Sequence, residues 1–127
     1  MSDRKEDLSI YKKALEVLTM PVLLVGSDEH IIFMNKAYGE FLGVDPEKII
    51  GKHICEVIEN SRVPLVLKTQ KAEYAHRHKY SQGKVKGKEI IVHRIPIVEN
   101  GKSIGVFGLL MFTSIEDLMA LAEKNQK

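Results

Sequence analysis

The segment of residues 21–43 constrains the fold of this chain most strongly, because it predicts a β-hairpin followed directly by a capped helix. Residues 22–25 are an apolar run without a polar break, which is typical of a strand buried on both faces. A polar turn separates this run from a second extended run, residues 31–34. Asn35 can accept the free N–H groups at the start of a helix, and Gly43 can end that helix in the left-handed conformation.

Three further strands are predicted in the second half of the chain, over residues 72–80, 89–97 and 103–113. The last of these carries apolar side chains on both faces, so we expect it to lie in the centre of a sheet. The first has a mostly polar alternation, which is typical of an extended segment. Its even-numbered residues are predicted to share one face: Tyr74, His76, His78 and Tyr80.

The bulk properties indicate one globular domain. A chain of 127 residues that is 44% hydrophobic can bury a core of its own. A net charge of +2 is too small to favour nucleic acid or an anionic membrane as a partner. A single cysteine, no apolar signal core and no run of roughly 20 apolar residues favour a cytoplasmic protein that does not span a membrane.

The two ends of the chain are predicted to be amphipathic helices. Within residues 7–20, apolar side chains recur every three or four positions, which makes one stripe. The stripe can cover the outer face of this chain's own sheet, pack against the same helix of a second copy, or do both. The residues of this expected dimer contact are Leu8, Tyr11, Leu15 and Leu18. We therefore divide the chain into a dimerisation helix (1–20), a core (21–113) and a C-terminal signalling helix (114–127).

The order of elements, two strands, several short helices and three strands with the last one central, is that of a PAS domain. The resemblance covers residues 14–118 and is carried by three segments and a helix start: VLLVGSDEHIIFMNKAYGEFLGV, PEKIIGKHI, HRIPIVENGKSIGVFGLLMF and SIEDL. Two segments, SRVPLVLKTQKAE and IIVHRIPI, are most similar to the PAS input domains of bacterial enhancer-binding transcription activators. Gln70 stands where we expected a glycine in that type.

This resemblance implies an α+β fold and a sensory function. The implied fold is a five-stranded antiparallel sheet of order 2-1-5-4-3, with short helices on one face that enclose a small cavity. The implied function is that of a sensor in signalling or transcription regulation, which transmits the binding of a small metabolite through the flanking helices to an output domain in a longer chain. The alternative is a PAS domain with a filled core that serves only in dimerisation and protein interaction.

Two arginines are the leading candidates for ligand binding. Arg94 interrupts an apolar strand, so it must reach water, pair with an acid such as Glu73, or meet an anionic ligand. Arg62 lies at the start of a predicted helix, and the planar fork of arginine matches a carboxylate. If His76 and His78 face inward with Tyr74 and Tyr80, they make a polar pocket wall suited to an anion; the alternative is that they are structural or surface histidines.

Cofactor and enzyme chemistry find little support in the sequence. Residues 62–71 contain no histidine that could serve as the axial haem ligand found in haem-binding PAS domains. Cys55 lies in HICEVI, which lacks the asparagine and glutamine of flavin-binding members, so we expect a small core residue there. A zinc site at the histidines would need further cysteines or a nearby carboxylate, so no metal site is predicted. The sequence has none of the common catalytic motifs, and we expect no enzyme activity.

Overall fold

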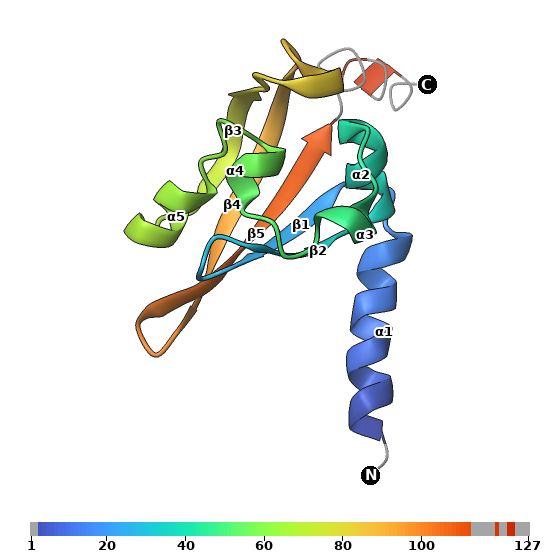
Figure 1. Ribbon diagram of the computed structural model, residues 1–127, viewed down its shortest axis with the longest axis vertical. Coiled ribbons are helices and arrows are strands. Elements are labelled where there is room, and N and C mark those ends of the chain that lie inside the picture. The colour runs from blue at the N-terminus through green and yellow to red at the C-terminus, as the bar shows by residue number, and fades with distance from the viewer. Residues whose placement is uncertain (1–2, 113–118, 120–121, 124–127) are drawn as a thin grey trace.

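A computed structural model describes residues 3–112, 119 and 122–123 (Figure 1). Within this part of the chain, two strands, a series of short helices and three further strands follow one another in the predicted order. They are α1 (Asp3–Val17), β1 (Val22–Gly26), β2 (Ile31–Met34), α2 (Lys36–Leu42), α3 (Pro46–Ile49), α4 (Ile54–Val57), α5 (Val63–Thr69), β3 (Glu73–Lys79), the 3₁₀ helix η1 (Gly83–Val85), β4 (Glu89–Glu99) and β5 (Lys102–Phe112).

The strands of the described residues form one antiparallel sheet in the order β2-β1-β5-β4-β3, which confirms the predicted α+β fold. The central strand is β5, which pairs with β1 on one side and with β4 on the other. Along β5, Val106 and Leu110 are buried, whereas Phe107 and Leu109 on the other face are only half-buried. Apolar residues on both faces therefore identified the central strand correctly.

The predicted hairpin and capped helix are confirmed. Strands β1 and β2 pair antiparallel, and α2 begins immediately after β2. The Asn35 side chain accepts a hydrogen bond from the backbone N–H of Tyr38 at 3.0 Å. Gly43 ends the helix with φ 79°, a backbone conformation that glycine adopts without a clash from Cβ.

Asn35 also joins three elements, an arrangement that we call the Asn35 junction. Its Nδ2 donates to the backbone carbonyls of Leu15 (3.1 Å), Leu18 (3.4 Å) and Met20 (2.9 Å). Its Oδ1 accepts the N–H of Val22 at 3.0 Å in addition to the cap bond. The side chain is fully buried. One amide therefore connects the end of α1 and the segment after it to the starts of β1 and α2.

Among the described residues, the short helices α2 to α5 cover one face of the sheet (Figure 1). The helix α5 has Arg62 at its N-cap position, and the hydroxyl of the preceding residue, Ser61, accepts the N–H of Val63 at 3.1 Å. Gln70 ends α5 in the left-handed conformation, with φ 58°. Its side-chain amide donates to the Gly101 carbonyl at 3.0 Å, a contact that a glycine could not make.

The core lies between these helices and the inner face of the sheet. Its fully buried members come from both layers, which shows that the helices close over the strands. They include Val25, Ile31, Met34, Ile54, Val66, Ile90, Val106 and Leu110.

Helix α1 extends away from the sheet (Figure 1). It ends at Val17, three residues before the predicted end at Met20. Leu8 and Tyr11 are about two-thirds exposed, at 67% and 68%, and Leu18 is 43% exposed. Within one chain the helix therefore does not cover the outer face of the sheet, which was one of the two expected partners of its apolar stripe.

The predicted C-terminal helix, residues 114–127, lies outside the described residues apart from Met119, Ala122 and Glu123, which are exposed. None of the helices that the structure describes is long and apolar enough to cross a membrane.

Candidate functional site

A bulge in β3 decides which side chains of this strand meet β4. In the ladder, Glu73 pairs with Arg94 and His76 pairs with Val92, and the register shifts between the two pairs. Ala75 lies within this shift and has φ 51°. The extra residue places Glu73 on the same face as His76, although strict alternation would place them on opposite faces.

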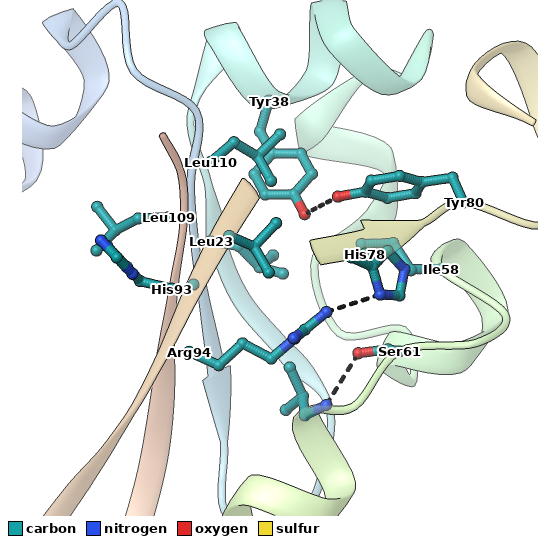
Figure 2. A pocket seen from close by; sticks show the side chains of 13 residues that line it. Leu23, Tyr38, Ile58, Ser61, His78, Tyr80, His93, Arg94, Leu109 and Leu110 are labelled. Atoms are coloured by element: carbon teal, nitrogen blue, oxygen red, sulfur yellow. Dashed lines mark hydrogen bonds between the residues drawn. The ribbon is translucent and has the colours of Figure 1, made fainter. Parts of the chain in front are cut away.

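The bulge corrects the prediction for Tyr74. Its side chain is 64% exposed and packs edge-to-face against the ring of His93, with the centroids 5.5 Å apart. His93 and Leu109 lie on the opposite side of the strands from Arg94 (Figure 2). Tyr74 is therefore not part of the polar wall that we predicted, and Glu73 takes its place.

The other four predicted site residues come together around Glu73. Arg94 donates through Nη1 to Glu73 Oε1 at 2.9 Å and to His76 Nδ1 at 3.2 Å. Its Nη2 donates to His78 Nδ1 at 2.8 Å. Arg62 donates to both carboxylate oxygens of Glu73, with contacts of 2.6, 2.9 and 3.1 Å. We call these five residues the arginine cluster.

The contacts to Arg94 fix the protonation of the two histidines. A guanidinium group only donates hydrogen bonds, so Nδ1 of His76 and Nδ1 of His78 must both accept. Each ring is therefore neutral, with its proton on Nε2. Burial, followed by the charge of Arg94, lowers the pKa of His78 to about 4, and burial lowers the pKa of His76 as well.

The cluster holds an excess of positive charge. Arg62 and Arg94 are cations, and Glu73 is the anion between them. The hydrogen bonds from Arg62 lower the pKa of Glu73, so it stays ionised at neutral pH. Arg94 is only 6% exposed, and burial lowers the pKa of its guanidinium group. With both histidines neutral, two cations face one anion, and the cluster carries one uncompensated positive charge.

A small cavity lies beside the cluster. It has a volume of about 20 Å³, and its lining includes Arg94, His78, Ser61 and the two tyrosines Tyr38 and Tyr80 (Figure 2). The tyrosine hydroxyls are hydrogen-bonded to each other at 3.0 Å, and burial raises the pKa of both phenols. A cavity of this volume has room for about one water molecule.

His78 carries an unpaired donor in this cavity wall. The side chain is 4% exposed, and within the part of the chain that the structure describes its Nε2 has no hydrogen-bond partner. Because Nε2 carries the proton, the unsatisfied group is an N–H donor, which favours an acceptor atom in the cavity. Among the described residues, no three or more His, Cys, Asp or Glu side chains are placed so that they could hold a metal ion.

Sequence reasoning assigned a lesser role to Glu73 and did not place Tyr38 and Ser61 in the site. Glu73 was expected only as one alternative partner of Arg94. The role of Glu73 depends on the bulge at Ala75. Ala75 has a positive φ, but it is not a glycine, so the sequence gives no signal of the bulge. From the sequence, Tyr38 is expected to be a core residue of the helix after the hairpin. In the structure it lines the cavity together with Tyr80, to which its hydroxyl is hydrogen-bonded although the two are 42 residues apart.

Comparison with known proteins identifies the family. A sequence model of the PAS fold matches residues 9–111, so the chain belongs to the PAS family. PAS domains are sensory, non-catalytic parts of signalling proteins.

One curated relative illustrates this membership. A probable C4-dicarboxylate sensor kinase of Halalkalibacterium halodurans is 35% identical over 103 residues, which cover 81% of this chain and 18% of the relative. The chain thus spans less than a fifth of the length of that protein.

The structural similarity extends over most of the chain. The Escherichia coli DhaR(N)–DhaL complex contains a chain that matches with a TM-score of 0.68 and 16% identity, over 86% of this chain and 37% of the other. The PAS domain of BvgS from Bordetella pertussis matches with a TM-score of 0.61 and 15% identity, over 95% and 99% of the two chains. At these identities the likeness shows the fold alone.

Proposed function

We propose that this chain is the sensory domain of a bacterial signalling or transcription-regulatory protein, and that it binds a small anionic metabolite at the arginine cluster. The observation that carries this proposal is the buried cation Arg94, 6% exposed, which shares its one carboxylate partner, Glu73, with Arg62. An unbalanced charge in a desolvated site is costly, and an anion that enters the cavity would offset that cost. The unpaired Nε2–H of His78 would supply a further hydrogen bond.

The position of the cluster in the sheet suggests how occupancy is transmitted. Arg94 pairs with Gly108 of the central strand, and β5 runs from there to Phe112, beyond which lies the predicted signalling helix. On the other side of β5 lies β1, whose start is bound to the Asn35 junction. A shift of β4 against β5 would therefore reach both ends of the domain.

Binding of small acids to the purified domain tests this function. We expect acetate, succinate or citrate to raise the melting temperature saturably in the wild-type protein, relative to sodium chloride at the same ionic strength. Arg94→Met should abolish the effect, because it removes the charge but keeps an apolar side chain of similar length. Arg77→Met is the matched control, since Arg77 is exposed and pairs only with Glu89. Failure of every small acid to bind the wild-type domain would refute the proposal.

A second function, a filled PAS core that serves only in protein interaction, is favoured by one observation. The cavity volume of about 20 Å³ accommodates a single water molecule and no metabolite without rearrangement. Native mass spectrometry separates the two functions. A protein mass without an adduct, in the presence of millimolar acids and together with an unchanged melting temperature, would favour this second function.

Helix α1 supports a homodimer as the working state. The predicted apolar stripe consists of Leu8, Tyr11 and Leu15 in α1 and Leu18 just after it. All but Leu15 are exposed in the part of the chain that the structure describes. We expect Leu15→Glu to halve the mass in solution measured by light scattering, because it places a charge in the helix seam. Lys13→Glu, on an exposed position of the same helix, should leave the mass unchanged. A monomeric wild-type protein would exclude this dimer.

The kind of output domain that a longer protein would carry is a further part of the proposal. The segments around α5 and β4 favour an enhancer-binding transcription activator, whereas the 35% identical relative is a sensor kinase. The gene sequence downstream of Lys127 would decide between them, because an ATPase and a DNA-binding domain differ from a kinase in their motifs.

A further inference from the structure

Glu73 is a carboxylate held by two guanidinium groups, but the two hold it unequally. Arg62 contacts both of its oxygens, whereas Arg94 contacts only Oε1. The Arg62 side chain is 41% exposed and that of Arg94 is 7% exposed. Glu73 could therefore leave Arg94 and keep its stronger, more exposed partner.

The groups that Glu73 would leave behind match a carboxylate. Arg94 Nη1 would regain a free donor, and His78 Nε2–H is already without a partner. Both side chains line the same cavity, and both are more than nine-tenths buried. A guanidinium group with a released donor and a positive charge is the chemistry that recognises a carboxylate. His78 Nε2–H lies on the side of its ring away from Arg94 and is a separate donor (Figure 2).

We infer that Glu73 occupies the place of a ligand carboxylate, and that the ligand is a small organic acid that binds by exchange with Glu73. This inference rests on the ligand-binding function proposed above and specifies its chemical class and its mechanism. The exchange gives each arginine its own carboxylate, because Glu73 stays with Arg62 while the acid pairs with Arg94. The acid carboxylate would take the place of the Glu73 carboxylate at Arg94, and Arg94 also lines the cavity of about 20 Å³.

The local backbone is suited to such a movement. Glu73 is the first residue of β3, and β3 is an edge strand that pairs only with β4. The bulge at Ala75 already interrupts the ladder next to Glu73. Displacement of Glu73 therefore disturbs the end of one ladder, and through Arg62 it changes the contacts at the start of α5.

Truncation of Glu73 tests the exchange. In Glu73→Ala, the internal competitor is gone, so sodium acetate and sodium propionate should bind at least tenfold more tightly than to the wild-type protein, measured by isothermal titration calorimetry. Propionamide, a neutral molecule of the same shape, should not bind. Glu89→Ala is the matched control, because it removes a glutamate that pairs with an arginine at an exposed site. It should retain wild-type affinity.

A second variant covers the case in which Glu73→Ala fails to fold. Glu73→Gln keeps the size of the side chain and an oxygen acceptor but removes the charge, and it should also bind propionate more tightly than the wild type. If neither variant that folds binds acids more tightly than the wild type, the exchange is refuted. Binding to the wild type with no gain in the variants would refute the exchange but leave the proposed function intact. Binding to the Glu73 variants alone would mean that Glu73 blocks the site permanently, and it would refute both the exchange and the proposed function.

Discussion

The Asn35 junction and the arginine cluster are both buried polar sites, but they satisfy their polar groups differently. Asn35 is fully buried, neutral, and has partners for both atoms of its amide. The arginine cluster is charged, carries one uncompensated cation and leaves His78 Nε2–H without a partner. A fully paired network stabilises one structure, whereas an incompletely paired charged network favours the binding of another molecule. The comparison therefore supports a structural role for the first site and the proposed ligand-binding role for the second.

The largest effect is expected from Asn35→Ala. The change leaves buried N–H and carbonyl groups of three elements without a partner, so we expect a loss of about 3 kcal/mol or more in the free energy of unfolding. This exceeds the loss of roughly 1 kcal/mol that a helix cap alone would explain. Urea denaturation measures it. Asn60→Ala is the control, because the exposed Asn60 donates only to the Lys79 carbonyl. Equal losses in the two variants would remove the basis for a junction.

Acid should destabilise the arginine cluster through His78. The folded protein holds this ring neutral, with a pKa of about 4, whereas the unfolded chain protonates it near pH 6.5. The unfolded state therefore binds more protons between these values, and stability is lost as the pH falls from about 6.5 to about 4. The contribution of His78 is about 3 kcal/mol.

The variant that tests this pH effect is His78→Asn. Its Oδ1 can accept the hydrogen bond from Arg94 in place of Nδ1, but it cannot be protonated in this range. Denaturation at a series of pH values should show a smaller decrease than in the wild type, with a remainder from His76, whose pKa is also lowered. His30→Asn, at an exposed histidine, should keep the wild-type decrease. An unchanged slope in His78→Asn would contradict the neutral, buried ring.

The smallest effect is expected from Arg62→Ala. Arg62 is 41% exposed, so solvent screens its pair with Glu73 and the loss of stability should be about 1 kcal/mol. The pKa of Glu73 should rise toward the usual value, because the hydrogen bonds from Arg62 are the main cause of its lowering. NMR titration of the Glu73 carboxyl carbon measures this rise. Arg77→Ala, which breaks the exposed pair with Glu89, should leave the Glu73 titration unchanged.

The sequence predicted the sheet better than it predicted the site, for physical reasons. Strand order follows from hydrophobic patterns, and the two apolar faces of β5 located its centre. The site depends instead on the bulge at Ala75, and no glycine or proline marks that position. Without the bulge, alternation assigns Tyr74 to the site and excludes Glu73.

The Asn35 junction shows the same limit at longer range. Its cap bond to Tyr38, three residues away, can be predicted from local sequence. Its contacts with Leu15, Leu18 and Met20 depend on where α1 ends, and this was predicted three residues too late. The contacts of Asn35 with this segment could not be predicted, because the sequence pattern did not locate the end of α1.

The Asn35 amide has a geometric consequence for an assembled receptor. Since it gathers carbonyls from the last turn of α1 and from the segment that leads into β1, the helix leaves the domain in a fixed direction. If two copies join along α1, the angle between their domains would thus be set by one buried side chain in each copy, Asn35. A rotation of the sheet would then change the direction of α1 by the same angle, because Asn35 connects the two.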